Sequence, residues 1–91
     1  MAVVLRIPAH LRVSADGLDR IELQGGTLGE VLGHLGDRHS DLRAQLVDDV
    51  GRPRRCLRLY VNDDDAATGH GLDTPVRDGD EITVLLALAG G

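Results

Sequence analysis

The sequence predicts an α+β domain in which one main helix packs across one face of a mixed sheet of four or five strands. Three observations favour this fold class. Residues 3–7 and 56–61 alternate between apolar and polar side chains, as half-buried strands do. Residues 82–87 form a further apolar run that begins with β-branched side chains. Residues 28–35 carry apolar side chains at the three- and four-residue spacing of an amphipathic helix.

Length and composition restrict the classes of protein that fit. A chain of 91 residues has room for one hydrophobic core. Tyr60 is the only aromatic residue, so the core must consist of Leu, Val, Ile and Ala. Single-stranded nucleic acid is bound by a basic groove and by aromatic side chains on which bases stack. The net charge of −5 and the single aromatic residue therefore argue against nucleic-acid binding. All ten basic residues are arginines, so no lysine amine is present to accept an isopeptide bond.

The N-terminal third predicts a hairpin. In residues 3–7 the apolar side chains fall on one face of a strand, with Arg6 on the other. Asp16-Gly17 supplies a turn signal, and residues 18–23 contain a second alternation. The connection between the two strands is too long for a tight two-residue turn.

The middle of the chain predicts a capped helix. Thr27-Leu-Gly-Glu30 has the spacing of a capping box, in which Thr27 accepts a bond from the Glu30 amide and the Glu30 side chain returns one. Gly36 is the expected C-cap. Ser40 is expected to cap a short second helix. The apolar stripe of the main helix consists of Leu28, Val31, Leu32 and Leu35.

The C-terminal half predicts two strands and a tail. Residues 48–55 form a polar loop, residues 56–61 a strand, and Asp78-Gly79 a turn before the last strand. If the first and last strands pair side by side in the middle of the sheet, the fold is a β-grasp, as in ubiquitin. We therefore expect a β-grasp domain over residues 1–87, followed by a flexible tail over residues 88–91.

No residue pattern predicts an active site or a metal centre within this chain. The four histidines lack the spacing of a metal-binding helix, and Asp63-Asp64-Asp65 lacks the glycine and distal Glu of a calcium loop, so a solvated turn is expected. A single cysteine excludes an internal disulfide, and Cys56 is expected to be a structural or incidental thiol.

Two further expectations concern location. The apolar start of the chain is too short for a signal peptide, and no segment is long enough to cross a bilayer. We therefore expect a cytoplasmic protein with no membrane partner.

The chain ends in Gly90-Gly91, directly after an apolar run. Glycine has no Cβ, so such a tail can lie extended in a channel too narrow for other residues. This composition suggests a C-terminal carboxylate that is inserted into another protein. Frayed, small terminal residues are the alternative interpretation.

Several short motifs, in this order and spacing, carry a resemblance to a known family. They are Ile7-Pro8, Thr27-Leu28-Gly29, Tyr60-Val61-Asn62-Asp63, Asp78-Gly79-Asp80 and Ala89-Gly90-Gly91. Over essentially all 91 residues the chain resembles the ThiS/MoaD family of ubiquitin-like sulfur carriers, and within it the carriers of cysteine biosynthesis.

The resemblance implies a non-enzymatic carrier that binds no cofactor of its own. A partner enzyme similar to ubiquitin-activating enzymes would use ATP to adenylate the carboxylate of Gly91. A sulfur donor would then displace AMP and leave a thiocarboxylate. A sulfur-accepting synthase would receive the sulfur for the biosynthesis of cysteine or of a thio-containing metabolite, and a protease would release the product.

The resemblance also implies roles for residues near the tail. Leu88, Ala89 and Gly90 would thread into the active site of the partner, and Leu85 would contribute to docking if it faces away from the helix. Two alternatives remain at this point. The chain would be a ubiquitin-like protein modifier that uses the same C-terminal activation, or a binding module whose tail is incidental.

Overall fold

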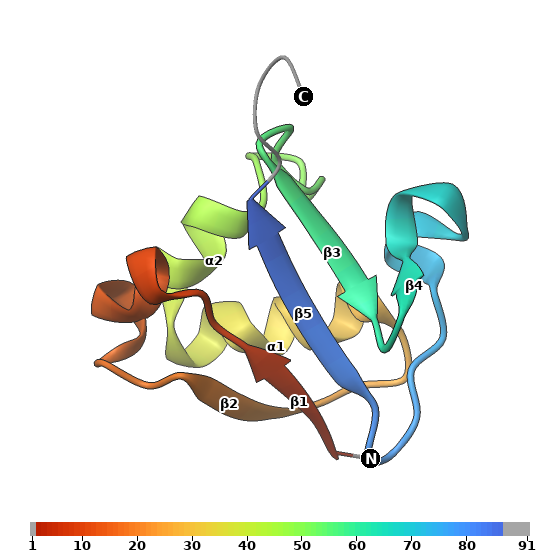
Figure 1. The fold of residues 1–91 in the computed structure, drawn as a ribbon, viewed down its shortest axis with the longest axis horizontal. Helices are drawn as coiled ribbons and strands as arrows, with labels where there is room; N and C mark the ends of the chain where they lie inside the picture. Colours follow the sequence, from red (N-terminus) through yellow and green to blue (C-terminus); the bar gives the residue numbers. More distant parts are fainter. Residues whose placement is uncertain (1, 87–91) are drawn as a thin grey trace.

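The computed structural model describes residues 2–86, in which a five-stranded sheet carries the helices on one face (Figure 1). The strands are β1 (Ala2–Arg6), β2 (Arg20–Gln24), β3 (Leu57–Val61), β4 (Asp64–Asp65) and β5 (Glu81–Leu86). The α-helices are α1 (Leu28–Arg38) and α2 (Ser40–Leu46), and the 3₁₀ helices are η1 (Ala9–Ala15), η2 (Ala66–Thr68) and η3 (Gly71–Asp73).

The sheet has the order β2-β1-β5-β3-β4, which places the first and last strands side by side. β1 and β5 run parallel, with Leu5 opposite Ile82. β2 pairs antiparallel with β1, and β3 pairs antiparallel with β5. This arrangement confirms the predicted β-grasp fold, because a parallel central pair is flanked by antiparallel strands and crossed by the main helix (Figure 1).

The core lies between the sheet and the two α-helices. Every fully buried side chain among residues 2–86 is apolar, as the near absence of aromatic residues requires. The predicted stripe of α1 is confirmed, since all four of its residues are at most 2% exposed. The inward-facing core residues of the strands are Val3, Leu5, Ile21, Leu23, Leu57, Leu59, Val61, Ile82 and Val84.

The start of α1 is capped almost as predicted. The Thr27 hydroxyl accepts a hydrogen bond from the Glu30 amide at 3.2 Å. The Glu30 carboxylate accepts a bond of 2.7 Å from the amide of Gly26, one residue before the amide of Thr27 that a capping box uses as the donor. Both bonds satisfy amides at the helix start that have no intrahelical partner.

The end of α1 differs from the prediction. Gly36 does not end the helix, which continues to Arg38 and has His39 as its C-cap. The physical reason for a glycine here is close packing, because a Cβ on Gly36 would collide with the side chain of Arg43 in α2. The short second helix is confirmed at Ser40–Leu46, but Ser40 does not cap it, because the helix already begins at Ser40 and its N-cap is His39.

The long connection between β1 and β2 contains η1, which the sequence pattern did not predict. The turn at Asp16-Gly17 is confirmed, since both residues have positive φ angles, of 56° and 82°. The turn at Asp78-Gly79 is also confirmed, with φ of 88° at Gly79. The predicted tail, residues 88–91, lies outside the described residues.

Candidate functional site

The candidate site begins where β5 ends. The residues predicted to thread and react, Leu88 to Gly91, lie outside the described residues, so the structure describes the base from which they continue. β5 pairs with β1 on one side and with β3 on the other. Its last residue, Leu86, is the register partner of Leu57 in β3. Ile82 and Thr83 of β5 are therefore paired on both sides, whereas its last residues, 84–86, are paired with β3 alone.

Leu85 lies on the outer face of the sheet, away from the helices. Its neighbours along the strand, Ile82 and Val84, are buried, whereas Leu85 is 48% exposed. Arg58 of β3 lies directly opposite it in the register. The role of Leu85 in docking remains a prediction, but an exposed Leu beside an arginine is a suitable contact for another protein.

Leu86 was expected to point toward the helix side, yet it is 51% exposed. It lies at the mouth of a groove of about 410 Å³, which Leu11 and Leu57 also line, together with His10 and Cys56. The alternation of β5 predicts the direction of this side chain but not its exposure, because its exposure depends on residues of η1 and α2 that are distant in sequence and line the same groove. Cys56 is a free, exposed thiol at this groove.

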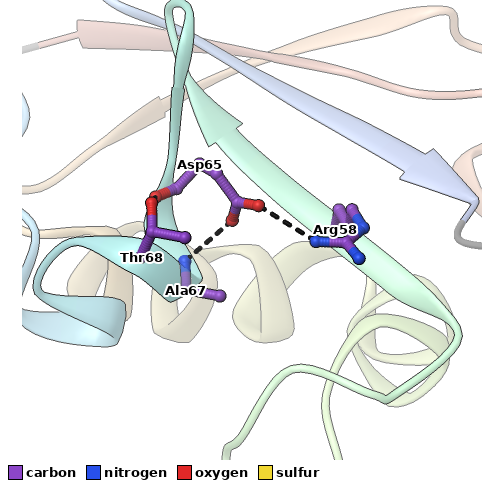
Figure 2. Close-up of polar contacts among 4 residues, drawn as sticks. All are labelled: Arg58, Asp65, Ala67 and Thr68. Atoms are coloured by element: carbon purple, nitrogen blue, oxygen red, sulfur yellow. Dashed lines mark hydrogen bonds and ion pairs between the residues drawn. The ribbon is translucent and has the colours of Figure 1, made fainter.

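A polar contact on β3 was missed by the sequence analysis (Figure 2). Arg58 Nη1 donates to Asp65 Oδ2 at 3.2 Å, and Asp65 Oδ1 accepts a bond of 2.9 Å from the amide of Ala67, which caps η2. The side chain of Asp65 is only 14% exposed. The expectation of a solvated Asp63–Asp65 turn is thus wrong for Asp65, because its carboxylate is used by two partners.

A groove of about 800 Å³ lies at the other end of β3. Asp63, Asp64, Asp80 and His70 contribute to its lining. Within residues 2–86, no group of three or more His, Cys, Asp or Glu side chains is arranged to hold a metal ion. This groove is far from the base of the tail along β3 and β5, so we do not place the carrier chemistry there.

One carboxyl group has a clearly perturbed pKa. The hydrogen bond from the Arg52 amide is the largest cause that lowers the pKa of Asp48 below 3.8, and the bond from the Val50 amide adds to it. These bonds shape the loop before β3.

Over the described part of the chain, no helix is long and apolar enough to cross a membrane.

Comparison with known proteins identifies the family. The profile of the ThiS family matches residues 5–91, which include Gly90-Gly91. The chain belongs to the ThiS family. The predicted resemblance is therefore confirmed.

Three similar proteins cover the chain almost completely. The sulfur carrier protein CysO of Mycobacterium tuberculosis is 38% identical over 93 residues, covering 100% of both chains. The crystal structure of the BexX/CysO complex of Amycolatopsis orientalis matches with a TM-score of 0.89 and 38% identity, over 99% of this chain and 100% of that chain. Small archaeal modifier protein 1 (SAMP1) of Methanosarcina acetivorans matches with a TM-score of 0.83 and 25% identity, over 99% and 96% of the two chains.

Proposed function

We propose that this protein is a sulfur carrier whose C-terminal carboxylate, on Gly91, is converted to a thiocarboxylate. The observation that carries the proposal is the similarity to sulfur carrier proteins, at 38% identity over 100% of both chains. The match of the ThiS family through residue 91 includes the Gly-Gly pair in the region of similarity. The protein is a carrier and not an enzyme, as its relatives are named.

The chemistry requires activation because a free carboxylate is a poor electrophile. An adenylating enzyme transfers AMP from ATP to the Gly91 carboxylate and releases pyrophosphate. Hydrosulfide, or a donor that supplies it, then attacks the carbonyl carbon, and AMP leaves. The product is a thiocarboxylate that holds reactive sulfur on the protein, so that no free sulfide diffuses away.

The carrier itself contributes geometry. Binding of the folded domain to the adenylating enzyme brings Gly91 next to ATP, so proximity supplies much of the rate. Leu88, Ala89 and Gly90 thread into the active site, and Leu85 on the outer face of β5 contacts the enzyme. ATP is bound by the partner and not by this chain.

The sulfur then passes to a second partner. The thiocarboxylate sulfur displaces the leaving group of an activated serine derivative held by a synthase, which gives a thioester to Gly91. An S-to-N acyl shift moves the Gly91 acyl group to the amine, and a protease hydrolyses the resulting amide and releases cysteine. These steps take place in the cytoplasm, where ATP and the amino-acid precursor are available.

Adenylation is tested by ATP–pyrophosphate exchange with the purified adenylating enzyme of the source organism. The wild-type chain is expected to stimulate exchange, and a chain that lacks Gly91 is not. A Leu85→Ala variant keeps the tail and tests docking alone. Exchange that is equally stimulated by the chain without Gly91 would contradict the proposal.

A second candidate function is that of a protein modifier. The similarity to SAMP1, at 25% identity and a TM-score of 0.83, favours it. The same acyl-adenylate would then be attacked by a lysine amine of another protein to form an isopeptide bond. Covalent conjugates of this chain in cells, lost on deletion of Gly90-Gly91, would favour the modifier, and their absence would favour the carrier.

A further inference from the structure

Charge is unevenly distributed along this acidic chain. Residues 50–62 contain four arginines and no acidic residue, whereas residues 63–81 contain seven acidic residues and one arginine. β3 and β5 are antiparallel, so Leu57 lies beside Leu86 at one end of the sheet and Val61 beside Ile82 at the other. In Figure 1 the start of β3 lies next to the arrowhead of β5. The basic segment is therefore at the end from which the tail continues, and the acidic segment is at the opposite end.

Three of these arginines share one groove. Arg54, Arg55 and Arg58 line a cleft of about 360 Å³ beside the first half of β3. Apolar atoms form most of the rest of its lining, from Pro53, Leu57, Leu59, Ala66 and Ala67. We call these three side chains and the cleft between them the arginine groove. An apolar floor with guanidinium groups around it suits an acidic peptide segment that also carries an apolar side chain.

Two of the guanidinium groups are held in place. Asp65 binds Nη1 of Arg58 and is itself fixed by the amide of Ala67 (Figure 2). Arg54 donates from Nε to the carbonyl of Ala44 at 2.9 Å. Each guanidinium has five N–H donors, so most of them remain available to a partner. Fixing the side chains in advance reduces the entropy that binding would otherwise cost.

The arginine groove is continuous with the surface proposed for docking. Arg58 is the register partner of Leu85, and Leu57 that of Leu86. An enzyme that encloses the tail must approach this end of the sheet, so its surface there would meet three arginines together with the carboxylates of Asp48 and Asp65 beside them.

We propose that the arginine groove binds an acidic segment of the adenylating enzyme and orients the carrier with its tail toward the active site. This inference rests on the proposed function. The separation of charge turns the basic end toward an acidic partner before contact, which raises the association rate. Nucleic acid is the less suitable occupant, because Tyr60 is the only aromatic residue that could stack on a base.

The test compares Arg55→Glu with a matched control. Arg55 is exposed and lies in the groove. Arg20 is also exposed, but it lies on β2, at the opposite edge of the sheet. Arg20→Glu makes the same change in charge. Association of each variant with the purified adenylating enzyme is measured by stopped flow or surface plasmon resonance at low and high ionic strength, and far-UV circular dichroism verifies the fold.

Arg55→Glu is expected to lower the association rate constant about tenfold at low ionic strength, with a smaller difference at high ionic strength. Arg20→Glu is expected to change it by less than about twofold. Arg58→Gln, which removes charge without reversing it, should give an intermediate loss. Adenylation at saturating enzyme should be unchanged in Arg20→Glu, because Arg20 lies outside the groove and the tail is intact.

Several outcomes would overturn the inference. If the wild type is adenylated but Arg55→Glu and Arg20→Glu associate equally fast, the groove is not the docking surface and the proposed function stands. If the wild type is not adenylated at all, the proposed function fails, and this inference fails with it. Saturable binding of a labelled single-stranded oligonucleotide that Arg55→Glu abolishes would assign the groove to nucleic acid instead.

Discussion

Replacing Ile82 with alanine should strongly destabilise the domain without altering the chemistry of the tail. Ile82 is 0% exposed and lies in β5, with Leu5 of β1 and Val61 of β3 as its register partners on either side. Removing three buried carbon atoms from such a site costs about 2–5 kcal/mol. We expect the upper half of this range, because strands hydrogen bonded on both sides cannot close the cavity.

The size of the expected effect can be compared with the total stability. A domain of this length is stabilised by about 5–14 kcal/mol, at roughly 0.05–0.15 kcal/mol per residue. A loss of about 3–5 kcal/mol therefore removes a large part of the stability and lowers the melting temperature by more than about 10 °C. Urea unfolding followed by far-UV circular dichroism measures the change, since the chain has no tryptophan to report by fluorescence.

Leu85→Ala is the matched control in the same strand. Leu85 is 48% exposed, so its truncation should cost less than about 1 kcal/mol while weakening binding to the adenylating enzyme. Ile82→Ala should show the opposite result, with normal adenylation per folded molecule. A loss below about 1 kcal/mol for Ile82→Ala, or absent adenylation of its folded fraction, would refute the separation of core and docking surface.

Three further predictions concern local contacts. Thr27→Ala should cost about 1 kcal/mol in urea unfolding, because the Glu30 amide loses its cap, and an unchanged midpoint would contradict the cap. Asp65→Ala should speed hydrogen exchange of the Ala67 amide, since that amide loses its 2.9 Å acceptor; equal exchange rates would show that the bond is absent in solution. The folded-state pKa of Asp48 is lowered, so its stabilising contribution is present above pH 3.8 and is lost as the pH falls through the lowered pKa. A carboxyl titration by NMR should give a midpoint below 3.8, and Asp48→Asn should remove this contribution to acid sensitivity.

Periodicity alone predicted the strands and the main helix, because burial of one face of an element dictates the spacing of its apolar side chains. The Leu28–Leu35 stripe and the alternation in β3 depend only on neighbours in the sequence, and both are found in the structure. The pairing of the first and last strands followed from economy of packing in a small domain. The short motifs that carry the resemblance depend only on their order and spacing along the chain, and all of them lie within the residues that the ThiS family profile matches.

Features that depend on contacts distant in sequence could not be predicted. Gly36 resembles a helix end until the helix is seen to pack against Arg43, which excludes a side chain there. Asp65 resembles its two acidic neighbours until β4 pairs with β3 and brings it to Arg58. The arginine groove likewise requires η2 to pack beside β3, which local patterns do not specify.

The most direct test of the sulfur-carrier function is the intact mass of the protein after reaction. The chain is incubated with its adenylating enzyme, ATP and a sulfide source and then measured by mass spectrometry, with a chain lacking Gly91 as the control. The carrier function predicts that the wild type gains the mass difference between sulfur and oxygen, in an ATP-dependent manner, and that the shortened chain does not. An unchanged wild-type mass with an active partner, or the same gain without Gly91, would contradict it.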